Sequence, residues 1–486
     1  MNTLKTVIIR LIDDDPTIIN RLEEYFRNTV IEKRANQQRV GLQLSTYDIM
    51  VDASKEILID WLLGHRIALV QNHFVMFDDT TGWTVLDGEY DKNDFVLALD
   101  RLTRSFGVSG RALNGAADMI AAAIKTRPNP NVIQFGDCYL HGQTFHRGTY
   151  SEMPPQFIIH RNCWEYLHGK SLADIHVSAV DDLIEQVAGS REDGERFLAV
   201  RACGFVLDKE FYLNFGRAVY VYGPRGGEGK TLYTNLEHMM VGDKNYSTFS
   251  YPQLDDYHLA NMTRSLFAYD LDADCEYMSG EPSTIFKQIV SHDEMTVREI
   301  YGKPQSIHPS CSLRMTSNHF FKANEKSRAL LRRFDFYKTG PSLDTLQLPS
   351  SWFETLKTQK AADYLFVRQI LALKKVIESQ SLPPVTERGQ QLLDLALTPN
   401  NSIITFIEER GVDQIVNWTV RDVREAYEQW CNESGVAVLG LKKFNAALEA
   451  ESSLTRKNLA TNRAHGPAAD AAMADQRYAI KCWVSD

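Results

Sequence analysis

The segment at residues 223–231, GPRGGEGKT, constrains the fold of this chain more than any other stretch of its sequence. The β-branched and aromatic run at 217–222 precedes it and predicts a buried strand, and the pattern at 231–240 predicts a helix. Four glycines in the connecting loop allow a tight turn whose backbone N–H groups can surround phosphate oxygens. A strand, a glycine-rich loop and a helix in this order predict an α/β domain that binds phosphate groups.

The residues at the end of this loop have separate expected roles. Lys230 is expected to reach the β- and γ-phosphates of a nucleotide, and the Thr231 hydroxyl is expected to ligate Mg²⁺. The strict spacing GxxxxGK[ST] would place a glycine at position 224, which is a proline here. Either the loop is one residue longer or Gly226 makes part of the turn, and the alternative is a plain glycine-rich turn with an exposed lysine. The expected nucleotide-binding residues are Gly223, Gly226, Gly227, Gly229, Lys230 and Thr231.

Three further apolar runs, at 265–269, 312–316 and 334–337, predict strands downstream of the loop. Helical patterns lie between them, and strands that alternate with helices favour a parallel α/β sheet. A polar residue that ends such a strand beside a phosphate-binding loop is a candidate for the chemistry of phosphoryl transfer.

Two of these strands end in such polar residues. Asp270 ends the first run and is the preferred candidate for positioning Mg²⁺ and the attacking water, with Asp272 as the second candidate and Asp274 as a solvated loop acid. Asn318 follows the second run, and its amide can hydrogen-bond a γ-phosphate or the attacking water. Taken alone, a strand-terminating turn asparagine is the simpler interpretation of Asn318.

Arg332 and Arg333 stand just before the last predicted strand. An arginine supplied across a subunit boundary stabilises the charge on a transferring phosphoryl group. A solvated basic pair is the alternative. The candidate catalytic residues are therefore Lys230, Asp270, Asp272, Asn318, Arg332 and Arg333.

These elements, in this order, resemble the superfamily III helicases, which belong to the AAA+ group of ring ATPases. The closer resemblance is to the poxvirus- and phage-type primase-helicase family, and it is carried by GGEGKT, LFAYD, MTSN and LRRF. The segment KQIVSHDEMTVREIYGKP at 287–304 resembles that family's extra segment between the second and third motifs. Ser291 and His292 replace the usual Gly-Gly there, and Asp270 stands where Glu is common. The resemblance covers most of the chain from residue 47 onward.

The resemblance implies a homo-hexameric ring that hydrolyses ATP with Mg²⁺ and moves single-stranded DNA through a central pore. The extra segment would form a hairpin in that pore, with Lys303 at its tip or as an ordinary turn lysine. Arg298 is a second DNA-contact candidate, or holds an acidic partner within the subunit. In the tail, the cations that could contact phosphates are Lys442, Lys443, Arg456 and Lys457, with scattered surface charge as the alternative.

The predicted fold is α/β, with an AAA+ type P-loop ATPase core, a mixed α+β accessory domain before it and a winged helix after it. The winged helix is expected because three helical patterns precede an apparent strand within residues 401–486. No room remains for a primase domain. The predicted divisions are an extension at 1–45, the accessory domain at 46–195, the ATPase core at 196–345, a helical segment and linker at 346–395, and the winged helix at 396–486.

Composition limits the class of protein further. The net charge of -10 argues against a protein that coats nucleic acid with its whole surface, but it leaves room for a narrow basic channel. Seven scattered cysteines without a CxxC pair favour neither zinc nor a disulfide framework, and they fit a reducing cytoplasm. Because no stretch approaches roughly 18 uninterrupted apolar residues, no membrane span is expected.

The sequence thus predicts an ATP-driven hexameric DNA helicase that acts in the replication of a phage, plasmid or other mobile element. Its expected partners are single-stranded or forked DNA and further copies of itself. A separate primase or polymerase is a possible partner, and the acidic first hundred residues are a candidate docking region. The main alternative is a DNA-binding initiator or loader that uses ATP as an assembly switch, and a ring RNA helicase is a weaker one.

Overall fold

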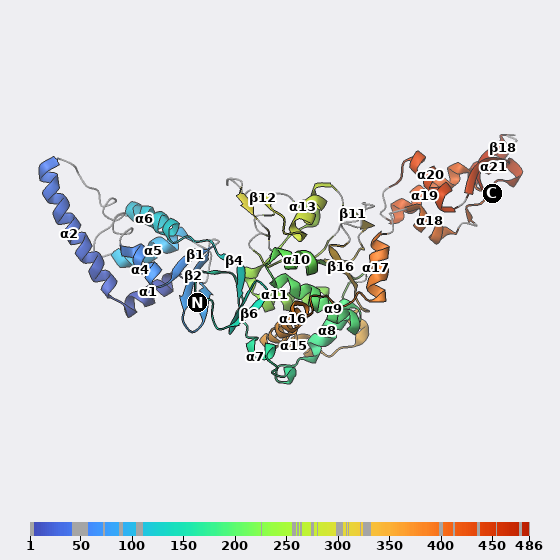
Figure 1. The fold of residues 1–486 in the computed structure, drawn as a ribbon. Helices are drawn as coiled ribbons and strands as arrows, with labels where there is room; N and C mark the ends of the chain where they lie inside the picture. The colour runs from blue at the N-terminus through green and yellow to red at the C-terminus, as the bar shows by residue number, and fades with distance from the viewer. Residues whose placement is uncertain are drawn as a thin grey trace. The chain divides into compact units, whose positions relative to one another are not determined.

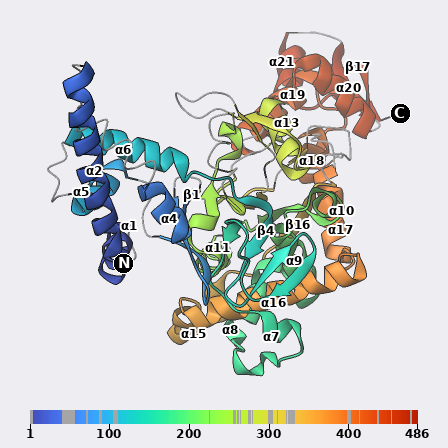
Figure 2. The same ribbon diagram turned by 60° about the vertical axis from the view of Figure 1, so that its left-hand side comes forward.

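The computed structural model divides the chain into two compact units, Met1–Phe321 with Ser327–Leu393 and Lys322–Lys326 with Asp394–Asp486. Figure 1 and Figure 2 show the fold in two views. The structure describes residues 4–40, 57–70, 73–86, 91–103, 110–224, 226–254, 259, 262, 265–273, 277–278, 280–297, 305–307, 309, 311–320, 322–323, 332–397, 402–411, 414–434, 438–452, 454–475 and 479–485.

The N-terminal part of the first unit has a hydrophobic core of its own. That core extends from Val7 on the first helix to Ile124 just after α6. An antiparallel sheet of order β1-β2-β3 belongs to this part, and Asp78 closes its second hairpin by accepting hydrogen bonds from the Thr80 and Thr81 N–H groups. The elements are α1 (Leu4–Asp14), α2 (Thr17–Val40), α4 (Ile59–Gly64), β1 (Ile67–Val70), β2 (His73–Asp78), β3 (Gly82–Val85), α5 (Lys92–Thr103) and α6 (Gly110–Ala123).

A second sheet and a group of helices come next in the chain. The sheet has the order β6-β5-β4-β7. Its buried residues Ile133 and Leu140 belong to the same hydrophobic cluster as Val219 of the next sheet, so this region packs with the strands that follow it. The elements are β4 (Asn129–Gln134), β5 (Cys138–His141), β6 (Thr144–Arg147), β7 (Pro155–Ile158), α7 (Trp164–Leu167), α8 (Ser178–Ala188), α9 (Arg191–Ala202) and α10 (Lys209–Phe215).

The central sheet has five strands in the order β16-β8-β14-β10-β9, and every neighbouring pair is parallel. This confirms the predicted parallel α/β sheet. The strands are β8 (Ala218–Tyr222), β9 (Tyr246–Thr248), β10 (Phe267–Asp270), β14 (Ser312–Ser317) and β16 (Phe334–Lys338). β8, β10, β14 and β16 are buried along almost their whole length. Buried parallel strands favour apolar and β-branched residues, and these make the four strands recognisable in the sequence.

Helices complete the first unit around this sheet. α16 packs against α9 and α11, and Figure 1 and Figure 2 both show α11 and α16 side by side. The remaining elements here are α11 (Lys230–Val241), β11 (Tyr277–Met278), α13 (Gly280–Val290), β12 (Met295–Val297), β13 (Gln305–Ile307), α15 (Ser350–Thr355), α16 (Gln359–Ser379) and α17 (Glu387–Leu397), of which α17 continues past Leu393.

The second unit has a small core that includes Phe406, Tyr427, Phe444 and Trp483. The three predicted helices and the predicted strand are present as α18, α19, α20 and β18, and the strand β17 and the helix α21, which the sequence does not predict, lie between α20 and β18. The winged-helix assignment stays a prediction. The elements are β15 (Lys322–Ala323), α18 (Ser402–Arg410), α19 (Val420–Ser434), α20 (Leu441–Ser452), β17 (Leu454–Ala460), α21 (Pro467–Ala474) and β18 (Ala479–Ser485), with β17 and β18 antiparallel.

None of the helices in the described ranges combines the length and the apolar character that crossing a membrane requires.

Candidate functional site

The glycine-rich loop joins β8 to α11, as the sequence predicts. Gly226, Gly227 and Gly229 have φ angles of +70°, +66° and +90°, in the left-handed region that glycine adopts without strain. Gly229 is the N-cap residue of α11, which begins at Lys230. The three later glycines therefore make the turn, and the loop accommodates one residue more than the strict motif.

At Gly223 a side chain is excluded by neighbouring side chains and not by the backbone angle. A Cβ atom at this position would lie 2.0 Å from Glu228 Oε2 and 2.7 Å from Lys230 Nζ. The Gly223 N–H donates to the Ser317 carbonyl at 3.0 Å, which joins the start of the loop to the end of β14. A side chain at Gly223 would displace the charged groups that pack there.

Lys230 connects the loop to the neighbouring strand. Its Nζ donates to the Gly223 carbonyl at 2.6 Å, to Glu228 Oε2 at 3.0 Å and to Asn318 Oδ1 at 3.0 Å. The structure thus brings together Lys230 and Asn318, two site residues that the sequence predicts 88 positions apart. The structure also places Glu228 at this contact, a residue that no sequence motif identifies.

These residues line one cavity of about 470 Å³, a size typical of pockets for small ligands. The cavity lies where adjacent parallel strands end, since Tyr222 of β8 pairs with Ser317 of β14, and Met315 of β14 pairs with Asp270 of β10. Its described lining consists of Gly226, Gly227, Glu228, Gly229, Lys230, Thr231, Leu232, Leu271, Asp272, Thr316, Ser317, Asn318, Leu343, Asp344 and Phe353.

The two candidate carboxylates have different surroundings. Asp270 is buried at the end of β10, its Oδ2 accepts a hydrogen bond from the Tyr251 N–H at 2.8 Å, and burial raises its pKa. Asp272 is exposed and is among the described residues that line the cavity, whereas Asp270 is not. The structure therefore presents the second candidate to the cavity and places the preferred candidate behind the strand end.

Hydroxyl groups of β14 hold the loop that carries Asp272. Thr316 Oγ1 donates to the Leu271 carbonyl at 2.7 Å, and Ser317 Oγ donates to the Ala273 carbonyl at 2.9 Å. The Ala273 N–H donates back to the Thr316 carbonyl at 2.8 Å. These bonds fix Asp272 relative to Asn318, and the only sign of them in the sequence is the Thr-Ser pair that precedes Asn318.

Arg332 and Arg333 lie at the amino ends of the parallel strands, opposite the carboxyl ends that line the cavity. Phe334, the first residue of β16, pairs with Ala218, the first residue of β8, whereas the glycine-rich loop follows the last residue of β8. A strand of five residues spans about 17 Å at 3.3 Å per residue. Neither arginine is thus brought to the cavity of its own chain.

The two arginines also differ from each other. Nε and Nη2 of Arg333 both donate to Ser291 Oγ, at 3.1 and 3.0 Å. Ser291 is buried, and Arg333 itself is half-buried, whereas Arg332 is exposed. The guanidinium that is open to another molecule is that of Arg332.

The candidate DNA contacts are only partly covered by the structure. Arg298 and Lys303 lie outside the described residues. The strands on either side of them are described, and β12 and β13 pair antiparallel with Val297 opposite Gln305. Lys442 and Lys443 are exposed in the first turn of α20.

A buried ionic network supports the helix that follows the loop. Glu237 of α11 accepts hydrogen bonds from Arg201 Nε at 3.0 Å, from Tyr269 OH at 2.7 Å and from Gln369 Nε2 at 3.0 Å. Arg314 Nη1 of β14 lies 3.4 Å from the same carboxylate. The network joins α9, α11, β10, β14 and α16, and it could not be anticipated because these residues show no shared spacing.

Electrostatic attraction decides the ionisation of this network. Burial by itself would raise the pKa of Glu237, but attraction to Arg201 and Arg314 outweighs it and lowers the pKa to about 2. Burial lowers the pKa of Arg314, whereas the attraction of Glu237 raises that of Arg201 despite its burial. The charged form of Glu237 is thus required by its surroundings.

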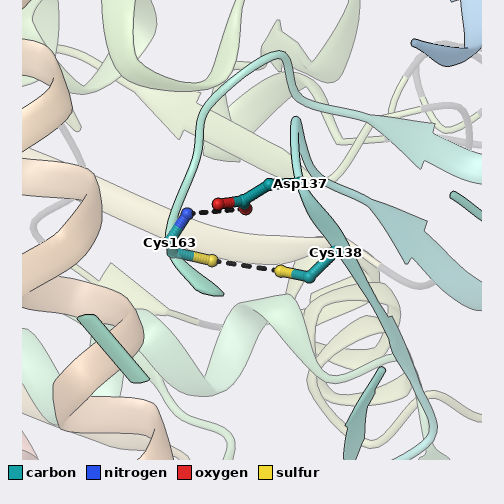
Figure 3. A group of neighbouring side chains, drawn as sticks. All are labelled: Asp137, Cys138 and Cys163. Carbon is teal, nitrogen blue, oxygen red and sulfur yellow. Dashed lines mark hydrogen bonds between the residues drawn. The ribbon is translucent and has the colours of Figure 1, made fainter. Parts of the chain in front are cut away.

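A second cluster, Asp137, Cys138 and Cys163, is the group of potential metal ligands found among the described residues (Figure 3). The two buried Sγ atoms lie 3.4 Å apart. Burial is the main cause that raises the pKa of the Cys163 thiol, and the contact with Cys138 raises it further. The Asp137 carboxylate accepts hydrogen bonds from the N–H groups of Cys163 and Trp164. These bonds make Asp137 a cap for the start of α7, with the thiols packed in the core beside it.

One family model matches a part of the chain. The family described as "Family of unknown function (DUF5906)" matches residues 221–333, which include the glycine-rich loop, Asp270, Asp272 and Asn318. No curated protein matches the chain.

Among solved structures, the chain is similar to the apo C-terminal region of NrS-1, at 10% identity and a TM-score of 0.43, over 88% of this chain and 98% of that one. The A form of the same region gives 9% identity and a TM-score of 0.42, over 88% and 98% of the two chains. JCV helicase, crystallised with a bound acetamide compound, gives 10% identity and a TM-score of 0.26 over 64% of this chain and 82% of that one. Likenesses this distant do not indicate which reaction this chain performs.

Proposed function

We propose that this protein is a superfamily III type DNA helicase that hydrolyses ATP as a ring of identical subunits in the replication of a phage, plasmid or other mobile element. The observation that carries the proposal is the cavity at the carboxyl edge of the parallel sheet. There the glycine-rich loop, Lys230, Asn318 and Asp272 come together from β8, β14 and the loop after β10. Ligands of open parallel sheets bind at this edge.

The residues present fit a nucleotide with Mg²⁺. The loop places left-handed glycines and a helix N-terminus beside Lys230, a combination suited to phosphate oxygens. The exposed Thr231 hydroxyl and the Asp272 carboxylate both line the cavity, and oxygen ligands of this kind suit Mg²⁺. When bound, Mg²⁺ would neutralise charge on the phosphates. The apolar side chains of Leu343 and Phe353 offer a surface for the base at the same cavity.

The chain's own polar groups would then act on the attacking water and on the developing charge. Asp272 would orient the water, and Asn318 would hydrogen-bond the γ-phosphate from the end of β14. Asp270 would hold the strand end through Tyr251. Arg332 would act on the nucleotide of a neighbouring subunit, because it is exposed and lies at the opposite edge of the sheet from its own loop.

Movement of DNA is assigned to the segment between β12 and β13. β12 and β13 pair antiparallel, and Arg298 and Lys303, which stand between them in the sequence, would supply the cations that contact the DNA backbone in the pore. Lys442 and Lys443 on α20 offer a further phosphate contact in the second unit.

The proposal is tested by ATP hydrolysis with and without single-stranded DNA. Lys230→Ala should lower kcat by about 100-fold or more, because the cation that faces the phosphates is lost. Lys375→Ala, which removes an exposed lysine of α16, is the matched control and should hydrolyse ATP normally. Normal turnover by Lys230→Ala would contradict the assignment.

A further inference from the structure

Glu228 is a buried carboxylate inside the glycine-rich loop itself. Its residue is only 2% exposed, and its Oε2 lies 3.0 Å from Lys230 Nζ. Gln186 of α8 holds the loop at this point, because its Nε2 donates to the Glu228 carbonyl at 3.3 Å and to the Pro341 carbonyl at 2.6 Å. The carboxylate is therefore fixed next to the one lysine expected to bind phosphate.

Lys230 has no donor left over in this arrangement. An ammonium group carries three N–H donors, and those of Lys230 are directed at Gly223 O, Glu228 Oε2 and Asn318 Oδ1. A phosphate oxygen that binds Lys230 must therefore replace one of these acceptors or share a donor with it. Glu228 is the only anion among the three.

Glu228 opposes phosphate binding whichever acceptor is replaced. If phosphate takes the place of Glu228, the buried carboxylate loses its ion pair with Lys230, which is unfavourable. If Glu228 keeps its contact, its negative charge stays next to the phosphates in a partly desolvated site, where like charges repel strongly. In both cases the free energy of nucleotide binding becomes less favourable than it would be with a neutral residue at this position.

We propose that Glu228 is an internal competitor of the nucleotide phosphates for Lys230 and that it sets a moderate nucleotide affinity. This inference rests on the proposed function, because it concerns the same site. Glu228 is a positioning residue, since it acts on the phosphates through Lys230. A moderate affinity speeds nucleotide release, which a motor that turns over repeatedly requires.

The test compares Glu228→Gln with the full-length wild-type protein by fluorescence titration with mant-ADP and Mg²⁺. Glutamine keeps the size of the side chain and an oxygen that can accept from Lys230, so only the charge is removed. The variant should bind about three- to tenfold more tightly and release mant-ADP more slowly. The KM for ATP should fall without a rise in kcat. Glu185→Gln, the same change at an exposed position of α8, should leave the affinity unchanged.

Each outcome of this titration either supports or contradicts the role of Glu228 as a competitor. Equal or weaker binding by folded Glu228→Gln would overturn the inference, because the carboxylate would then be neutral or helpful to binding. Glu228→Asn is a second neutral variant, and failure of both variants to fold would also count against a competitor role, since the charge would be needed for the loop structure. If the wild-type protein and Lys230→Ala both fail to bind mant-ADP, the proposed function fails. If wild-type binds, Lys230→Ala does not, and Glu228→Gln matches wild-type, only this inference fails.

Discussion

At the scale of single residues, Asp270 and Asp272 differ in burial and in their contacts. Asp270 accepts a backbone hydrogen bond from Tyr251 in a buried position, whereas Asp272 is exposed in the cavity. Asp272 faces the cavity, so its carboxylate can orient a water molecule directly. Asp270 binds the Tyr251 N–H, so it can influence that water only through the position of the backbone.

We therefore expect Asp272→Asn to lower the kcat for ATP by about 100-fold while mant-ADP still binds. Asp270→Asn should act mainly on stability, by about 1–3 kcal/mol, because it weakens the charged acceptor for the Tyr251 N–H. Steady-state kinetics and denaturant unfolding of both variants measure this. A larger loss of kcat in a stable Asp270→Asn protein would assign the reacting position to Asp270.

The sequence identifies Asp270 and Asp272 as candidates, but it does not show which of the two carboxylates faces the cavity. The motif and its strand contexts are enough to select Lys230 and Asn318, which the structure places in direct contact. The direction of the Asp270 side chain depends on the backbone of Tyr251, which lies 19 residues away in the chain. The contact of Glu228 with Lys230 depends likewise on the curvature of the loop, which the letters GPRGGEGKT do not define.

At the scale of secondary structure, the network around Glu237 joins the helix after the loop to β14, which ends next to Asn318. Removal of the Glu237 charge takes away the anion that pairs with the buried Arg201 and Arg314. Glu237→Gln should therefore lower the free energy of unfolding by about 3–5 kcal/mol. Denaturant unfolding checks this, with Glu192→Gln, an exposed change in the first turn of α9, as the control. A loss below about 1 kcal/mol would contradict the central place of Glu237.

The same carboxylate predicts how this difference depends on pH. The pKa of Glu237 is about 2 in the folded protein against 4.5 as the ordinary value, so its contribution is complete above pH 4.5 and is lost as the pH falls toward 2. The stability gap between wild-type and Glu237→Gln should narrow by about 1.4 kcal/mol from pH 7 to pH 3.5. Urea unfolding at the two pH values measures the gap. A gap that is the same at both would contradict the lowered pKa.

The strands of the central sheet show where sequence patterns succeed. Four of the five are buried along almost their whole length and contain aromatic, β-branched or other apolar residues, and these are predicted. The fifth, β9, is a three-residue edge strand, YST, with no buried residue, so it carries no hydrophobic signal. β17 is missed because four of its seven residues are polar and only Leu454 is buried, and because α21 separates it in the sequence from its partner β18.

At the scale of the whole molecule, we propose that two subunits build each site. Arg332→Ala and Lys230→Ala should each fail to hydrolyse ATP alone, since each lacks one half of the site. A mixture of the two should regain part of the activity, because a Lys230→Ala subunit supplies Arg332 to the intact loop of its neighbour. ATPase assays across mixing ratios measure this. An inactive mixture, in which pull-down through a tag on one variant also recovers the other variant, would place the arginine within its own subunit.

The hydrophobic cores also bear on how far domain organisation can be predicted. Ile133 and Leu140 share a hydrophobic core with Val219 of the central sheet. Shared burial depends on contacts between distant segments, and these leave no mark at a sequence boundary. The core around Val7 ends at Ile124, but a smaller cluster joins Trp83 of β3 to Ile158 of β7.

The central claim is that hydrolysis at the Lys230 site drives DNA unwinding. Its most direct test is displacement of a labelled strand from a forked duplex with a 3′ tail, in the presence of ATP and Mg²⁺. We predict displacement by the wild-type protein with ATP, none with a non-hydrolysable analogue, and none by Lys230→Ala. DNA-stimulated hydrolysis without displacement under any loading condition would contradict the claim and would favour an ATP-switched initiator or loader.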